Sequence, residues 1–298
     1  MTQQPPVFHV MKDLKQDIRR IGTALWIFAG VQMMLTLFIE RLAGFFWLNE
    51  DAAWITLVVS FVSGFCAILY LKPRFQISVR KEYGKPAGWK EILAGFSLMM
   101  LISFLWGMVQ VVLDPFLSSL GLEISEPDFG FGYGFFENLI LFFTIVIIGP
   151  VMEELVFRGL IYGQLRKYNA GFGMICSSFC FGLMHMNLSQ GVPTIAMGLI
   201  LAYFYEKSGS LKTSIGIHIL NNLFAFLSMN FPSCTALSFV ALALDVLAVI
   251  WTGTHQKEIV CFCEEQAGSG FHFETFVKTP AVLWLIVLFG ILVITDFF

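Results

Sequence analysis

Charged residues are scarce in this chain. Asp, Glu, Lys and Arg make up only 13% of its 298 residues, while 57% are hydrophobic. A soluble domain carries about 25% charged residues because its surface must be solvated. The composition therefore argues against soluble, disordered and coiled-coil proteins. The net charge of −3 argues against a nucleic-acid partner, which would require a basic excess. We expect a membrane protein whose surroundings are lipids.

Cysteine is scarce as well, with six residues along the chain. They are too few and too scattered for a disulfide framework, and we interpret them as free thiols. Cys176 and Cys180 stand one helical turn apart in an apolar run. Small apolar residues at this spacing are typical of helix packing rather than of a metal site.

Apolar runs long enough to cross a bilayer recur along the chain. A spanning helix needs about 20 mostly apolar residues to cross roughly 30 Å of hydrocarbon. Such runs occur at 21–39, 52–71, 92–113, 138–158, 170–186, 191–206, 212–230, 235–254 and 280–297. The sequence therefore predicts an all-α fold, a polytopic integral membrane bundle of eight to nine transmembrane helices. Residues 255–279 are expected to form a cytoplasmic loop.

The basic residues predict the orientation. Cytoplasmic loops of membrane proteins are enriched in Lys and Arg. With the spans above, 17 of the 18 Lys and Arg residues fall on one side, six of them in the loop 72–91, and Arg41 alone falls on the other. The N-terminus is therefore expected in the cytoplasm.

A small set of ionisable and amide side chains falls inside the apolar runs. An ionisable group costs at least about 2.5–3.5 kcal/mol in the middle of a spanning helix, so such groups usually face a protein interior or a water-filled cavity. The set comprises Glu153, Glu154, Arg158, His185, His218, Asn222 and Asp245. Polar groups also join membrane helices by hydrogen bonds, but so many on neighbouring spans favour a functional site.

The spacing of these residues predicts how they pair. Glu154 and Arg158 stand at i and i+4 and share one helical face, so the arginine is expected to neutralise that glutamate. Glu153 points about 100° away in a regular helix and is expected to remain unpaired. His218 and Asn222 also stand at i and i+4, so both could donate to one oxygen atom.

Three kinds of chemistry remain open for this set. A carboxylate and an imidazole can activate water while a second imidazole and an amide stabilise an oxyanion, as peptide hydrolysis requires. Alternatively, Glu153, His185 and His218 could be ligands of a zinc ion that activates the water. A non-catalytic membrane regulator or a proton-coupled transporter would use the same polar cluster for binding.

Three motifs on successive runs resemble a known family. Residues 153–158 read E-E-L-V-F-R and match E-E-x-x-x-R, residues 181–185 match F-x-x-x-H, and residues 218–222 match H-x-x-x-N. In this order they resemble the CAAX protease and bacteriocin-processing family, intramembrane endopeptidases related to the Ras-converting enzyme. The resemblance covers about residues 138–230, which we take as the core, between an N-terminal part (1–137) and a C-terminal part (231–298).

The resemblance implies a role for each motif residue. Glu153 would be the general base, His185 would help to position the water, and His218 with Asn222 would form the oxyanion hole, with Glu154 and Arg158 in support. It implies an endopeptidase with its active site open to the cytoplasm, acting on prenylated C-a-a-X termini or on small peptide precursors. Metal-independent glutamate catalysis is preferred over a metalloprotease, and a non-catalytic immunity protein is the alternative.

Overall fold

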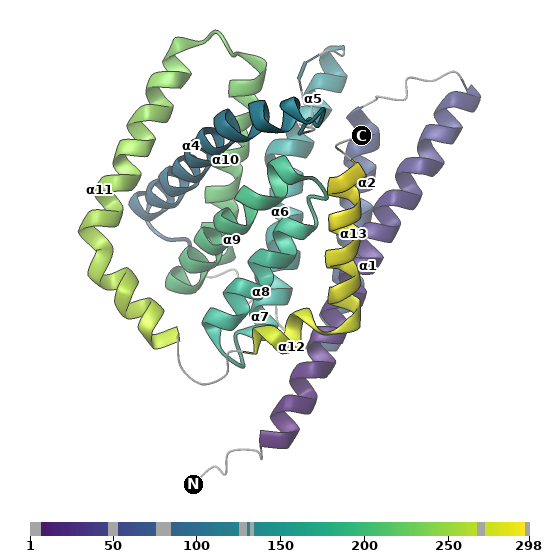
Figure 1. Cartoon of the computed structure of the whole chain (residues 1–298), viewed down its shortest axis with the longest axis vertical. Helices are drawn as coiled ribbons and strands as arrows, with labels where there is room; N and C mark the ends of the chain where they lie inside the picture. The colour runs from purple at the N-terminus through teal and green to yellow at the C-terminus, as the bar shows by residue number, and fades with distance from the viewer. Residues whose placement is uncertain are drawn as a thin grey trace.

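The computed structural model describes residues 7–46, 53–75, 85–124, 130–131, 134–266 and 272–295, which form a bundle of helices (Figure 1). The first helices are α1 (Val7–Phe46), α2 (Ala53–Phe75) and α4 (Trp89–Ser119). They are followed by α5 (Phe135–Phe143), η1 (Thr144–Ile148), α6 (Gly149–Glu154), η2 (Leu155–Tyr162) and α7 (Gly163–Leu165). The remaining helices are α8 (Ala170–Leu183), α9 (Leu188–Ser208), α10 (Leu211–Asn230), α11 (Thr235–Gln266), α12 (Phe273–Val277) and α13 (Pro280–Thr295).

The predicted fold class is confirmed, and the described parts of the nine expected runs are helical, except that the helix in the run 170–186 ends at Leu183. The loop expected at 72–91 includes residues 76–84, which lie outside the described ranges. The expected run 52–71 begins outside these ranges, and the expected run 280–297 ends outside them. Among the described residues, six helices are long and apolar enough to cross a membrane. The predicted span count was less accurate. With 14 and 16 residues, α8 and α13 reach only about 21–24 Å at 1.5 Å per residue, and α10 carries several polar residues.

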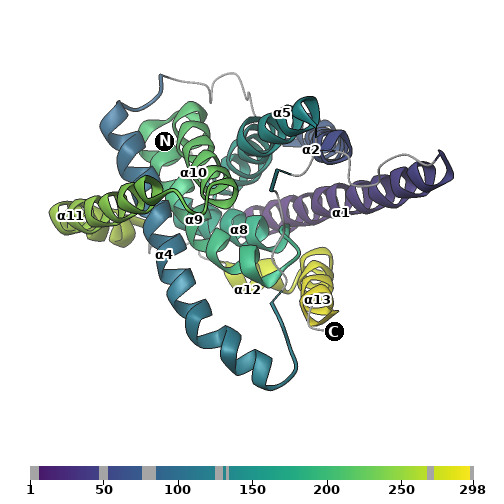
Figure 2. The same ribbon diagram turned by 90° about the horizontal axis from the view of Figure 1, so that it is seen from above.

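Helices α9 and α10 lie near the centre of the bundle. Seen from above, α4 and α11 flank them on one side, and α1, α2 and α13 lie on the other (Figure 2). Helix α8 packs against α9 at two glycines. A Cβ atom at Gly182 would lie only 2.5 Å from the carbonyl oxygen of Gly191. Side chains larger than hydrogen would therefore force these helices apart.

One helix runs without interruption from Phe135 to Leu165, but two parts of it, η1 and η2, are π-helical. Short π-helical turns widen a helix locally and occur often at functional sites. They flank α6, the single regular turn and a half that holds Glu153 and Glu154. In η2, the carbonyl oxygen of Phe157 accepts a hydrogen bond from the hydroxyl of Ser177 on α8 at 2.7 Å, which ties the two helices together.

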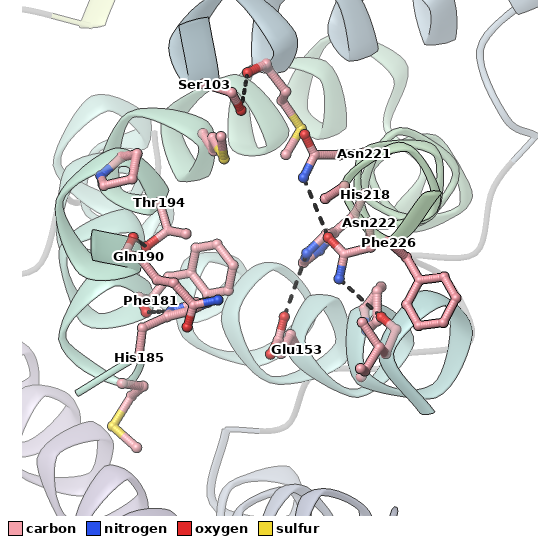
Figure 3. Close-up of a pocket in the computed structure, with 18 of the residues that line it drawn as sticks. Ser103, Glu153, Phe181, His185, Gln190, Thr194, His218, Asn221, Asn222 and Phe226 are labelled. Atoms are coloured by element: carbon pink, nitrogen blue, oxygen red, sulfur yellow. Dashed lines mark hydrogen bonds and ion pairs between the residues drawn. The ribbon is translucent and has the colours of Figure 1, made fainter. Parts of the chain in front are cut away.

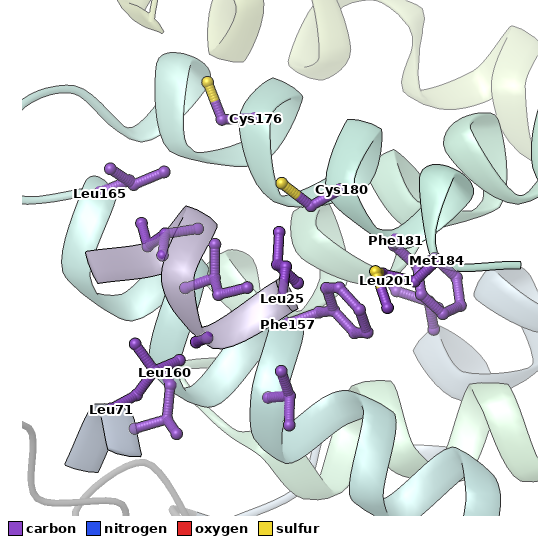
Figure 4. Close-up of a cluster of buried hydrophobic side chains, with 14 of the residues drawn as sticks. Leu25, Leu71, Phe157, Leu160, Leu165, Cys176, Cys180, Phe181, Met184 and Leu201 are labelled. Carbon is purple, nitrogen blue, oxygen red and sulfur yellow. The ribbon is translucent and has the colours of Figure 1, made fainter. Parts of the chain in front are cut away.

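The main hydrophobic core lies where η2 meets α1, α2, α8 and α9 (Figure 4). Its side chains are almost completely buried, and among them are Leu25, Leu71, Phe157, Leu160, Leu165, Leu201 and both thiols of α8. The thiols of Cys176 and Cys180 are free and buried, as the packing interpretation predicted. This core holds the helix with Glu153 and Glu154 against α8.

The expected loop at 255–279 is wrong for most of its described residues. Helix α11 continues to Gln266, and α12 begins at Phe273. Two contacts hold the end of α11 in place. Lys207 on α9 forms a 2.7 Å ion pair with Glu258, and the side-chain amide of Asn169 donates to the carbonyl oxygen of Gln266 at 3.0 Å. These contacts join residues far apart in sequence, so charge and hydropathy along the chain did not indicate them.

Candidate active site

A cavity of about 680 Å³ lies within the bundle. All four residues that the sequence analysis placed at the reaction centre line it: Glu153 from α6, His185 after α8, and His218 and Asn222 from α10 (Figure 3). Because α8 is short, the turn that carries His185 lies inside the bundle. That is how a residue at the end of α8 reaches the same cavity as Glu153.

Glu154 and Arg158 lie behind the cavity wall and are fully buried. Their predicted ion pair is present, with Nη1 of Arg158 2.8 Å from Oε1 of Glu154. The second terminal nitrogen, Nη2, donates to the carbonyl oxygen of Gly198 on α9 at 3.2 Å. This arginine therefore neutralises Glu154 and fastens η2 to α9.

The imidazole of His218 lies between the two glutamates. Its Nδ1 is 3.0 Å from Oε1 of Glu154, and its Nε2 is 3.5 Å from Oε2 of Glu153. The prediction that Glu153 is unpaired is therefore wrong, because the approach of α10 could not be read from one helix. A carboxylate only accepts hydrogen bonds, so Glu154 favours the form of His218 with a proton on Nδ1. In the imidazolium form, Nε2 can donate into the cavity as well.

His185 is oriented by the last turn of α8, which it follows. Its Nδ1 lies 2.9 Å from the carbonyl oxygen of Phe181, and because a carbonyl can only accept, Nδ1 carries the proton. The neutral ring then has its lone pair on Nε2. The next residue, Met186, has a φ of 56°, in the left-handed region that is unfavourable for a side chain of this size. The strained turn directs the chain back into α9.

Asn222 is held on its side of the cavity by a π-helical turn. Its Nδ2 donates to the carbonyl oxygen of Ile145 in η1 at 3.0 Å, and its Oδ1 accepts from Nδ2 of Asn221 at 3.3 Å. An amide nitrogen has two hydrogens, so one remains available. Thus His218 and Asn222 share a face as predicted, and Asn222 has one free hydrogen with which to donate to a common oxygen.

Phe181 organises the site without polar chemistry. The Cζ atom of Arg158 lies 4.4 Å from the centre of its ring. The rings of His185 and His218 meet it edge to face at centroid distances of 4.8 and 5.7 Å. Phe181 is the first residue of the F-x-x-x-H motif, so this motif supplies both an imidazole and the aromatic ring that contacts it.

Several uncharged polar residues of the cavity were also missed. They come from α1, α2, α4, η1, α9 and α10 and include Ser103, Gln190, Thr194 and Asn221. Uncharged polar residues are common in membrane helices, so no signal in a single sequence separates these from others. Asp245, one of the ionisable residues found within the apolar runs, lies on α11 and is not among the described residues lining the cavity.

The alternative zinc ligand set does not fit the described side chains. Glu153, His185 and His218 all line the cavity, but no group of three or more His, Cys, Asp or Glu residues in the described ranges is arranged to hold a metal ion. Nδ1 of His218 is directed at Glu154 and Nδ1 of His185 at a backbone carbonyl, so only the Nε2 atoms of the two rings could be ligands. We therefore derive no catalytic step through a metal.

Known proteins resemble the part of the chain that forms this site. Residues 135–224 match the family model "Type II CAAX prenyl endopeptidase Rce1-like". The chain is 28% identical over 135 residues to the "Putative membrane peptidase YdiL" of Bacillus subtilis, covering 41% of this chain and 55% of that protein. It is 33% identical over 147 residues to the "Membrane-embedded CAAX protease MroQ" of Staphylococcus aureus, covering 44% of this chain and 54% of that protein.

The chain thus spans about half the length of these two relatives. No solved structure matches it. The matched segment begins with α5 and ends within α10, and it contains all three motifs. The predicted resemblance is therefore confirmed over residues 135–224, which match the family model of Rce1-like CAAX prenyl endopeptidases.

Proposed function

We propose that this protein is an intramembrane endopeptidase that hydrolyses peptide bonds with a glutamate as general base. The observation that carries the proposal is that the Glu153 carboxylate, the His185 and His218 imidazoles and the Asn222 amide all line a single cavity in the bundle. These are the groups that water activation and oxyanion stabilisation require. The family match of residues 135–224 supports the same reaction class.

In this mechanism Glu153 removes a proton from a water molecule, which His185 orients through its Nε2 lone pair. The water attacks the carbonyl carbon of the substrate. Negative charge then develops on the carbonyl oxygen, and the free hydrogen of the Asn222 amide and the Nε2 proton of imidazolium His218 stabilise it. When this tetrahedral intermediate collapses, the C–N bond breaks and the proton held by Glu153 passes to the departing amine. Glu154 holds the ring of His218 in place, as the Nδ1 contact of 3.0 Å supports, and stabilises its positive charge.

The proposed substrates are peptides presented near the cytoplasmic face, either prenylated C-a-a-X termini or small peptide precursors. The name of MroQ, a membrane-embedded CAAX protease, supports this substrate class. The distribution of Lys and Arg supports the cytoplasmic face.

Hydrolysis by the purified protein in detergent tests the proposal. The substrates are a fluorogenic farnesylated C-a-a-X peptide and a synthetic library of unprenylated peptides. Replacing Glu153 removes the general base, so Glu153→Ala is expected to lower kcat by about 10²–10⁴-fold. Glu264→Ala, at an exposed position of α11, is the matched control and is expected to keep wild-type activity.

A chelator-treated sample is measured in parallel. Cleavage that survives chelation and is lost in Glu153→Ala supports glutamate-based hydrolysis. Cleavage lost on chelation and restored by zinc would instead establish a metalloprotease. Full activity in Glu153→Ala would refute the proposed role of this residue, and no cleavage of any peptide would favour a non-catalytic regulator.

A further inference from the structure

Gln190 belongs to the cavity wall but has no role in the mechanism above. It lies in the first turn of α9 and lines the cavity. Figure 3 shows its side chain extending from α9 into the cavity beside His185, across from Asn222. The tight packing of α8 on α9 at Gly182 and Gly191 explains why the first turn of α9 lies next to the turn that carries His185.

The orientation of the Gln190 amide is set by Asn187, the N-cap residue of α9. Nδ2 of Asn187 donates to Oε1 of Gln190 at 3.1 Å and to the carbonyl oxygen of His185 at 2.8 Å. Oδ1 of Asn187 accepts from the backbone N–H of Gln190 at 2.8 Å. Asn187 thus fixes both neighbours in one local network. Because Oε1 of Gln190 is engaged by a donor, its Nε2 group is the part of the amide that remains for another partner.

We propose that Gln190 is a substrate-binding residue, whose Nε2–H donates to a backbone carbonyl of the bound peptide on the His185 side of Glu153. This inference rests on the proposed endopeptidase function and extends it. A peptide crossing the cavity would be held by amides on both sides, Gln190 on α9 and Asn222 on α10. A donor at Gln190 would recognise the peptide backbone, so it would bind substrates of different sequence.

A purely structural role for Gln190 makes a different prediction. In that case only the Oε1 atom of Gln190 is needed, because this atom accepts the hydrogen bond from Asn187. Gln190→Glu keeps an oxygen at that position but replaces the donor by a second acceptor. Gln190→Met keeps the length of the side chain and removes both groups. Gln256→Met, the same change at an exposed glutamine of α11, is the matched control.

The experiment measures KM and kcat with one peptide. This is the peptide that the wild type cleaves best, chosen from the farnesylated probe and the unprenylated library. Loss of one hydrogen bond to bound substrate is expected to raise KM about 3- to 10-fold in both Gln190 variants while kcat changes less. Gln256→Met is expected to match the wild type. The rate is followed over a range of pH, because the added carboxylate could also disfavour ionisation of Glu153. An effect on the ionisation of Glu153 disappears at higher pH, whereas the increase in KM caused by the lost hydrogen-bond donor persists.

The outcomes separate the two hypotheses. A wild-type KM in Gln190→Glu together with a raised KM in Gln190→Met would overturn the inference and leave a structural role. Wild-type KM values in both variants would also overturn it, while cleavage itself would leave the proposed function intact. If the wild-type protein cleaves none of the peptides, the proposed function fails, and the inference fails with it.

Discussion

Arg158 is a fully buried charge whose partners are known atom by atom. Its guanidinium binds Glu154 and the Gly198 carbonyl and stacks on Phe181. Removing one member of a buried ion pair leaves an uncompensated charge and costs about 3–5 kcal/mol. We expect Arg158→Met to lower the free energy of unfolding by this amount, and to lower activity because Glu154 would no longer hold His218 in the same way. Unfolding by SDS titration in mixed micelles measures the first effect.

The Arg166–Glu206 pair provides the control at the same scale. Its atoms are 3.0 Å apart, but the two side chains are 31% and 29% exposed. A partly solvated pair of this kind contributes about 0–1 kcal/mol, so Arg166→Met should have a much smaller effect. Equal losses in the two variants would mean that burial does not determine the contribution of Arg158.

At the scale of helices, the site depends on how closely α9 approaches η2. A Cβ atom at Gly198 would lie 3.0 Å from Nη2 of Arg158 and 2.9 Å from Cβ of Ser178. Gly198→Ala should therefore push α9 away and displace the guanidinium. We expect a loss of activity of at least about tenfold, since shifts of about 1 Å at a catalytic centre can cost 10²-fold. The measurement is kcat/KM, with circular dichroism to show that the helices persist.

Gly107→Ala in α4 is the matched control, because nothing lies within 4 Å of the position that its methyl group would take. Alanine is the better helix former by up to about 1 kcal/mol. This variant should keep its activity and be at least as stable as the wild type. If Gly198→Ala behaved in the same way, the close contact would not be required for the site.

At the scale of the whole molecule, the orientation can be tested with the protein's own cysteines. Cys234 is exposed at the start of α11, and Cys261 and Cys263 are exposed near its other end. Cys261 follows Cys234 by 27 residues, which corresponds to about 40 Å of helix, more than the roughly 30 Å hydrocarbon core. With the N-terminus in the cytoplasm, Cys234 should react with an impermeant maleimide in intact cells, and the other two only after permeabilisation.

Single replacements identify the reacting thiol. External labelling should disappear in Cys234→Ser and persist when Cys261 and Cys263 are both replaced by Ser. Cys176 and Cys180 are buried in the core and should react in neither condition. Labelling of Cys261 or Cys263 from outside would reverse the proposed orientation and place the entrance of the cavity on the other side.

Hydropathy and motif order along the chain were enough to establish a helical membrane protein and to identify residues that line its cavity. Low charge and long apolar runs are informative because the free energy of transferring side chains into lipid is local and adds up along the chain. The pairing of Glu154 with Arg158 was also predictable, because both lie on one helix, one turn apart.

Contacts between helices, in contrast, became known only from the folded molecule. Three features require two or more segments to meet. They are the place of His218 between two carboxylates, the hydrogen bond from Asn222 to η1 and the position of Gln190 beside His185. The short α8 was read as a full span because hydropathy measures apolar length but not where a helix turns back. Packing at Gly182 and Gly198, together with strain at Met186, sets that turn. The amino-acid sequence alone does not give the distances between residues on different helices.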